Sequence, residues 1–523
     1  MNSNNKKINS LMSLDLKKLV LQLIKEGYLS ETDGKKLLDS SNSYTNKQVK
    51  RIFGLIKAEK KELAKINKLF NNSHKYLRLS FEGFKLTSPI SVRENGELLE
   101  QFCWSGHNIY PFPKIIDELT KGEKSNYITR EVDNLPVVII KKDKIFFSSV
   151  RYKDYHNFLA ERLPNLLKQI KTRGSLEDDE TIIPIHVFQL GHDPFLKRLE
   201  NKKKIKIITI PYKHFLLSST RTIYLVDDNM CIKLPINIHI TSDKRLIFQS
   251  YAHNAPIFAQ IIKDITVKEK LSTFSIAEDV ASVRIDDYYM AKHLCAIFRD
   301  SISIHKNTYP ANYLFEIYDM KTNKKVIQEL FFYKFGDKKE LLSKFFEKYV
   351  RVIIQAPIIL DIKYGIGVEP HLQNSFIMFD DKFMPMKLIL RDIDGTNINM
   401  PVLSKKLDLS YNFHKLTRFM FKSDQFSNIR LWDSLILFHT QELINILADN
   451  YHFSADQLWK QVVEEIKSTI YSLSSDPNNK ERIDMFEKHF FSELVPTRSF
   501  IKMKVSNSES FMTTDMRNFL YIR

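Results

Sequence analysis

Apolar positions near the start of the chain repeat with the spacing of a helix. Four of them fall on one face: Leu16, Leu19, Val20 and Leu23. This pattern predicts helices over residues 11–40, with Gly27 as a stop between them. A further helix is predicted from about residue 47 to residue 70, where lysines and arginines crowd the polar positions. The first part of the chain is therefore predicted to be helical.

From about residue 137 the pattern changes to the alternation and short apolar runs that are typical of strands. Predicted strands cover residues 137–140, 145–150, 182–188, 205–210 and 231–248. A hairpin is predicted to join residues 376–379 to 386–390. Helical patterns return over residues 431–449 and 455–473, and a short strand is predicted at 500–505. This order predicts an α+β fold with a helical N-terminal part, a β-rich middle and a mixed, helix-rich C-terminal part.

Two of the predicted strands present polar side chains on one face. Within residues 232–241, apolar side chains alternate with polar ones such as Lys233 and Thr241. An exposed strand face and a strand that lines a polar cleft both fit this pattern. Within residues 368–374, three side chains share parity: Glu369, His371 and Gln373. They could bind a metal-bound phosphate together, although a solvated strand can show the same pattern.

The composition limits the kinds of site that this chain can build. Its 523 residues include 79 basic and 62 acidic side chains, a net charge of +17. This charge favours either a nucleic-acid or membrane surface, or a pocket for anionic small molecules. The chain has only 13 glycines and contains neither G-x-x-x-x-G-K-[ST] nor G-x-G-x-x-G, so any bound nucleotide must be held by side chains.

The three cysteines, Cys103, Cys231 and Cys295, lie far apart, which excludes a local cysteine motif for zinc or an iron–sulfur cluster. Few, scattered thiols fit a reducing compartment. No apolar run reaches the ~20 residues that span a bilayer. We therefore expect a cytoplasmic protein without a membrane partner.

Six short motifs, taken in order and spacing, resemble the NRPS-independent siderophore synthetases, the aerobactin-synthetase-like IucA/IucC family. The resemblance covers the chain from about residue 95 to its end. The motifs lie at residues 106–114, 186–189, 219–222, 233–245, 369–374 and 391–395.

This resemblance implies a fold like a cupped hand. It implies a helical thumb-like region over residues 1–120, β-rich fingers over 121–310 and a palm-like mixed and helical region over 311–523. It also implies a homodimer that uses ATP and Mg²⁺ to adenylate a carboxylate, most often of citrate. An amine, polyamine or amino alcohol then attacks the adenylate, and AMP and pyrophosphate are released.

The resemblance also implies a role for each motif residue. The residues implied to hold ATP are Ser219, Arg221, Thr222, Lys233, His371 and Gln373. Those implied to hold the carboxylic acid are His107, Lys114, Thr241 and Arg245. Glu369 and Asp392 are implied to hold Mg²⁺, and His107, Arg221, Arg245 and His371 are implied to be catalytic. These roles suit the reaction, because preorganised cations stabilise the charge that gathers at the α-phosphorus.

The chain departs from the family motifs on the side of the carboxylic acid. Asn108 stands where the family has a proline, Tyr110 where it has a histidine, and Phe188 where it has a tryptophan. These departures leave open a degenerate member that binds ATP or a citrate-like ligand without turnover. A basic nucleic-acid-binding protein that uses residues 47–68 is a further alternative, but a solvated lysine-rich helix explains those residues, so we expect no nucleic-acid partner.

Overall fold

The computed structural model describes residues 2–39, 46–82, 96–106, 108, 110–112, 114, 123, 130–172, 176–240, 243–319, 322–336, 338–393, 397–417, 423–506 and 511–521. The chain combines many helices with one large sheet and several small ones, so the predicted α+β class is confirmed. Within the described ranges, none of the helices is long and apolar enough to cross a membrane.

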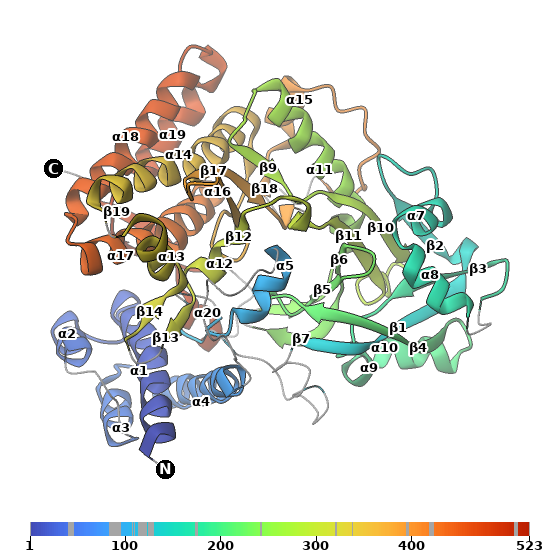
Figure 1. The fold of residues 1–523 in the computed structure, drawn as a ribbon, viewed down its shortest axis with the longest axis horizontal. Coiled ribbons are helices and arrows are strands. Elements are labelled where there is room, and N and C mark those ends of the chain that lie inside the picture. Colours follow the sequence, from blue (N-terminus) through green and yellow to red (C-terminus); the bar gives the residue numbers. More distant parts are fainter. Residues whose placement is uncertain are drawn as a thin grey trace.

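The N-terminal helices pack against the C-terminal ones at one end of the molecule (Figure 1). The N-terminal group comprises α1 (Asn2–Lys25), α2 (Glu31–Asp39), α3 (Asn46–Leu55) and α4 (Lys60–Glu82). The C-terminal group comprises α13 (Val326–Phe335), α14 (Lys339–Tyr364), α15 (Met400–Lys406), α16 (Asp424–Trp432), α17 (Gln441–Tyr451), α18 (Ala455–Leu473), α19 (Lys480–Phe490) and α20 (Phe500–Val505). Their apolar faces share one hydrophobic core, which reaches from Leu16 to Leu520.

An eight-stranded antiparallel sheet forms the other end of the molecule (Figure 1). In spatial order it contains β2 (Ile145–Ser148), β10 (Asp279–Ile285), β11 (Cys295–Asp300), β6 (Met230–Lys233), β5 (Thr222–Leu225), β4 (Lys206–Leu216), β1 (Glu131–Lys141) and β3 (Glu180–Pro184). Helices α7 (Tyr155–Arg162), α8 (Pro164–Lys171) and α10 (Pro194–Asn201) share a second core with it, to which α4 adds Tyr76. Helix α11 (Gln249–Lys268) packs on β10 and β11 and also joins the first core.

Smaller elements connect the two ends. A four-stranded sheet has the order β12 (Thr308–Pro310), β16 (Ser375–Phe379), β17 (Pro385–Leu390) and β9 (Phe274–Ile276). Two-stranded ribbons pair β7 (Ile236–Ile240) with β8 (Asp243–Arg245), β13 (Ile317–Asp319) with β14 (Lys324–Lys325), β15 (Ile366–Gly367) with β18 (Asn397–Ile398), and β19 (Leu494–Arg498) with β20 (Thr513–Arg517). The chain also contains three short helices, α5 (Gly96–Leu99), α9 (Gln189–His192) and α12 (Ala311–Leu314).

Several predicted elements are confirmed. Gly27 ends the first helical segment with a left-handed φ of 79°. The hairpin at 376–379 and 386–390 is the β16–β17 pair, and α18 covers the predicted range 455–473. The range 431–449 is helical throughout, but residues Asp433–Thr440 form a π-helical segment between α16 and α17.

Other predictions were wrong. The predicted helix at 47–70 is two helices, α3 and α4, separated by residues 56–59. The strand predicted at 232–241 breaks between β6 and β7, at Leu234 and Pro235. Residues 368–374 form a loop and a turn rather than a strand. Residues 500–505 form helix α20, because the Glu26 carboxylate accepts the backbone N–H groups of Ile501 and Lys502 at its first turn, at 2.8 and 2.7 Å.

Candidate active site

The turn between β4 and β5 carries the predicted phosphate-binding hydroxyls. Ser219 Oγ donates to Thr222 Oγ1 at 3.0 Å and accepts from the Thr222 backbone N–H at 3.3 Å. Thr220, at the centre of the turn, has a φ of 67°, a conformation that a β-branched residue rarely adopts. The turn is therefore held in a strained form that keeps its hydroxyls together.

A buried histidine holds this turn through a hydrogen bond to its backbone. His186 Nε2 lies 2.8 Å from the carbonyl oxygen of Thr220, and its Nδ1 accepts the backbone N–H of Phe188 at 3.1 Å. Since a carbonyl can only accept, the proton of the neutral ring resides on Nε2. Burial lowers the pKa of His186 to about 3, so the ring stays neutral. This histidine positions the turn that carries Ser219.

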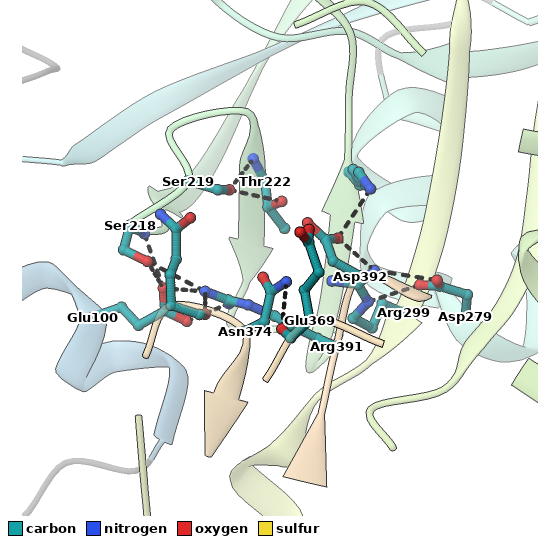
Figure 2. A network of polar contacts seen from close by, with 12 residues as sticks. Glu100, Ser218, Ser219, Thr222, Asp279, Arg299, Glu369, Asn374, Arg391 and Asp392 are labelled. Atoms are coloured by element: carbon teal, nitrogen blue, oxygen red, sulfur yellow. Dashed lines mark hydrogen bonds and ion pairs between the residues drawn. The ribbon is translucent and has the colours of Figure 1, made fainter. Parts of the chain in front are cut away.

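Lys233 lies opposite Thr222 across the β5–β6 pair, so the sheet register brings two predicted residues together. Its Nζ lies 3.0 Å from Asp392 Oδ1. Arg299 Nη2 donates to the same oxygen at 2.9 Å. Asp279 fixes Arg299 in turn, at 2.7 and 3.1 Å. Figure 2 shows this chain of charges from Asp392 through Arg299 to Asp279.

The Asp392 carboxylate is strongly held in its charged form. Burial alone would raise its pKa, but the charges of Lys233 and Arg299 outweigh burial and hold the pKa well below its usual value. Arg221 adds to this effect, and its backbone carbonyl accepts the N–H of Leu234, the residue after Lys233, at 3.0 Å. Arg221 itself is partly buried and forms no ion pair with a described residue, so its guanidinium can meet a ligand.

A second charged cluster lies beside the first (Figure 2). Arg391 donates to both oxygens of the fully buried Glu100, at 2.5 and 2.9 Å, and to the backbone carbonyl of Gln373 at 2.6 Å. Glu100 also accepts from the backbone N–H and the hydroxyl of Ser218. One arginine thus joins the β4–β5 turn to the loop at 368–374.

Glu369 is held by two arginines of the C-terminal part. Arg430 donates to both of its oxygens, at 2.7 and 2.6 Å, and Arg498 Nη1 lies 3.4 Å from Oε1. Burial would raise the pKa of Glu369, but the charges of Arg430 and Arg498 outweigh it and lower the pKa. Asp433 orients Arg498 through Nε at 3.0 Å.

The π-helical segment holds two of the motif loops. His439 Nδ1 donates to the carbonyl of Pro370 at 2.7 Å, and its Nε2 accepts from the Tyr349 hydroxyl at 2.7 Å. The carbonyl of Phe438 accepts from Asn108 Nδ2 at 3.2 Å. Such segments place carbonyls outside the regular helical ladder and are frequent at functional sites.

These loops surround a pocket. Its wall is formed by Cys103, Ser105, Gly106, Asn108, Ser218, Asn312, Phe315, His371, Leu372 and Gln373. His371 and Gln373, both predicted from the sequence, therefore face one pocket with Asn108 of the first motif. Burial lowers the pKa of His371 to about 4, which keeps the ring neutral near pH 7.

The remaining predicted residues are not among those that line the pocket, or are not described. Lys114 is buried, its backbone N–H donates to Ser73, and burial together with Arg130 lowers its pKa to about 7. Arg245 ends β8, opposite Ile236 of β7. His107 and Thr241 lie outside the described residues. The structure thus gathers Ser219, Arg221, Thr222, Lys233, Glu369, His371, Gln373 and Asp392 around the network and the pocket.

The sequence analysis missed five charged residues of this network: Glu100, Asp279, Arg299, Arg430 and Arg498. Each lies in an element without a recognised motif, and all but Asp279 are paired with a residue more than 60 positions away in sequence. A charged residue within an otherwise apolar segment could have indicated a buried ion pair, because buried charges are rarely left unpaired.

Comparison with known proteins shows which families parts of the chain match. Residues 97–316 match the IucA / IucC family, and residues 343–507 match the ferric iron reductase FhuF-like transporters. The family match covers 220 of the 523 residues, and the resemblance noted in the sequence is confirmed. The range that matches the FhuF-like proteins contains no cysteine.

Curated relatives extend this match. The chain is 24% identical over 350 residues to the uncharacterised protein y4xN of Sinorhizobium fredii, which covers 61% of this chain and 54% of y4xN. It is 23% identical over 487 residues to the D-ornithine–citrate ligase of Staphylococcus aureus, which covers 86% of this chain and 73% of the ligase. Staphyloferrin A synthase of the same organism is 24% identical over 59% of this chain, and the chain spans about half of that synthase, 54%.

Solved structures share the fold. Aerobactin synthetase IucC of Klebsiella pneumoniae superposes with a TM-score of 0.76 at 13% identity, covering 99% of both chains. ATP-bound aerobactin synthetase IucA of the same organism superposes with a TM-score of 0.71 at 14% identity, covering 88% of this chain and 83% of the other. The fold of this chain is therefore that of the aerobactin synthetases.

Proposed function

We propose that this protein is an ATP-dependent ligase that adenylates a carboxylate, with citrate as the best candidate, and condenses it with an amine or hydroxyl nucleophile. AMP and pyrophosphate would leave in the course of the reaction. The names of the relatives support citrate and an amine as substrates, and the ATP-bound structure with the same fold supports ATP.

One observation carries this proposal. Arg221 is a partly buried cation without an ion pair among the residues described, and it lies near the Lys233–Asp392 pair and beside the Ser219–Thr222 turn. A guanidinium of this kind, flanked by hydroxyl donors, binds phosphate oxygens through two parallel bonds. The arrangement needs no glycine loop, in agreement with the composition.

The residues present also fit a magnesium ion. Asp392 Oδ1 carries both ion pairs, whereas its Oδ2 forms no hydrogen bond or ion pair with a described residue. Glu369 keeps lone pairs beyond those that Arg430 and Arg498 use. Mg²⁺ binds through one or two carboxylates together with substrate phosphates. Asp392 and Glu369 would hold it, and it would neutralise phosphate charge.

The protein's own groups would perform the remaining tasks. Arg221 and Lys233 would stabilise the charge that develops at the α-phosphorus, which is worth most where water is excluded. Neutral His371, at the wall of the pocket, can accept a proton from the attacking amine. The buried Glu100–Arg391 pair would keep the two loops at a fixed separation during the reaction.

The experiment is citrate-dependent adenylation, measured as ATP–pyrophosphate exchange and as trapping of the adenylate with hydroxylamine. We expect the Arg221→Ala variant to lose at least ~100-fold in rate, because one preorganised transition-state contact contributes about 2.7 kcal/mol or more. The exposed Arg78→Ala on α4 is the matched control and should keep the wild-type rate. If the wild type is no faster than Arg221→Ala, the protein is a non-catalytic member that only binds these ligands.

A further inference from the structure

Asn108 lines the pocket beside His371 and Gln373, at a position where the family motif that the chain resembles has a proline. A proline side chain has neither a hydrogen-bond donor nor an acceptor, whereas an asparagine has both. The substitution therefore adds a polar group to the wall of the pocket.

The orientation of the Asn108 amide follows from its neighbours. Its Nδ2 lies 3.2 Å from the carbonyl oxygen of Phe438 and 3.2 Å from Glu442 Oε1. Both neighbours can only accept hydrogen bonds, so the NH₂ group must face them. Because the two ends of an amide point apart, Oδ1 points away from Phe438 and Glu442. Oδ1 forms no hydrogen bond with a described residue.

The acceptor that fixes this orientation is itself firmly held. Glu442 forms an ion pair with Lys325 at the start of α13. Burial would raise the pKa of Glu442, but Lys325 and the hydrogen bond from Asn108 outweigh it and lower the pKa, so the carboxylate stays an acceptor. Asn108 cannot flip its amide without placing Oδ1 against this negative charge.

We propose that Asn108 is a specificity-determining residue of the pocket, whose Oδ1 accepts a hydrogen bond from a donor group on the substrate. This inference rests on the proposed function and narrows it. The donor is either a hydroxyl of the carboxylic acid or the protonated amine of the nucleophile. No lysine or arginine lines the described wall of the pocket, so a neutral or cationic donor enters without repulsion there.

The test compares ligands with and without the donor. Calorimetry on the full chain measures the Kd of citrate and of tricarballylate, which is citrate without its hydroxyl, and the Kd of ornithine and spermidine. If the acid supplies the donor, the wild type binds citrate about 3- to 10-fold more tightly than tricarballylate, and Asn108→Leu reduces this ratio to below about 2-fold. If the amine supplies the donor, Asn108→Leu weakens the binding of ornithine or spermidine by a similar factor. The ratio between the Kd values of tricarballylate and citrate (the acid ratio) then stays unchanged.

Two further variants keep the test decisive. Asn108→Pro introduces the residue of the related synthetases and replaces Asn108→Leu if the latter does not fold. Lys325→Gln removes the ion pair to Glu442 but leaves Oδ1 in place, so it should change stability more than either binding ratio.

The inference is overturned if neither the acid ratio nor amine binding changes in the Asn108 variants. Because binding is measured without turnover, failure of the inference can be told apart from absence of adenylation.

Discussion

Glu369 and Asp392 each contact two cationic side chains, and these cations come from distant parts of the chain. Glu369 binds Arg430 and Arg498, and Asp392 binds Lys233 and Arg299. Removing one partner of such a buried pair leaves a charge that neither water nor protein satisfies, which costs far more than the loss of an exposed pair. Each cation therefore supports both the fold and the position of a site carboxylate.

The pair between Glu369 and Arg430 can be tested by its contribution to stability. We expect Arg430→Met to lower the free energy of unfolding by about 3 kcal/mol, because Glu369 then keeps only the longer contact to Arg498. Arg78→Met breaks an exposed pair with Glu82 on α4 and should change it by no more than about 0.5 kcal/mol. Urea unfolding of both variants measures the difference, and equal losses would contradict the role assigned to Arg430.

At this scale the sequence predicted the residues that lie in motifs but not the charges that hold them. Ser219, Thr222 and Lys233 follow one another closely along the chain and were found by their spacing. Arg430 lies 61 residues after Glu369, and no local pattern relates the two. Long-range pairs of this kind depend on tertiary structure, which a single sequence does not show.

The loop at residues 368–374 and helix α20 show why strand predictions failed at the scale of elements. The alternation of Glu369, His371 and Gln373 indicated a strand, but Pro370 has no N–H to donate to a neighbouring strand. The loop is held instead by the hydrogen bond between the Pro370 carbonyl and His439. In α20 the decisive partner is Glu26, which directly follows α1 near the other end of the chain. The hairpin β16–β17 was predictable because both of its strands and its turn are local.

The π-helical segment should support activity through His439. We expect His439→Leu to lower kcat/KM for citrate-dependent adenylation at least about 10-fold, because the carbonyl of Pro370 loses its donor and the loop with His371 shifts. Tyr349→Phe removes only the contact on the other ring nitrogen and is the matched control. It should lower the melting temperature yet keep kcat/KM within about 2-fold of wild type. A similar loss of activity in both variants would mean that the effect is one of stability alone.

At the scale of the whole molecule, the site lies where two hydrophobic cores meet. One core joins the N-terminal and C-terminal helices, and the other lies under the eight-stranded sheet. The Asp392 network crosses from one to the other, because Asp392 lies next to residues of the first core, whereas Lys233 and Arg299 lie next to residues of the second. The net charge of +17 is distributed accordingly: exposed lysines such as Lys60 and Lys61 on α4, and a few buried cations such as Lys233 and Arg299 in the site. The total charge can be counted from the sequence, but its division between the surface and the site depends on the fold.

Buried neutral histidines make the stability of the whole molecule depend on pH, and His186 is the clearest case. Burial lowers its pKa to about 3, whereas a histidine of the unfolded chain has a pKa of about 6.5. Between these values only the unfolded chain binds the proton, so the free energy of unfolding falls as the pH falls below about 6.5. At pH 5 this histidine alone accounts for a loss of about 2 kcal/mol relative to pH 7 or above.

The variant His186→Asn isolates this effect from those of the other titrating groups. It should be less stable than wild type at pH 7, because the carbonyl of Thr220 loses its imidazole donor, but it should lose less on going to pH 5. The exposed His156→Asn should keep the wild-type difference between the two pH values. Urea unfolding at pH 7 and pH 5 measures all three proteins. If the difference is unchanged in His186→Asn, the imidazole of His186 takes up a proton in the folded protein as readily as in the unfolded chain. The turn that carries Ser219 would then have to tolerate a charged imidazole in contact with it.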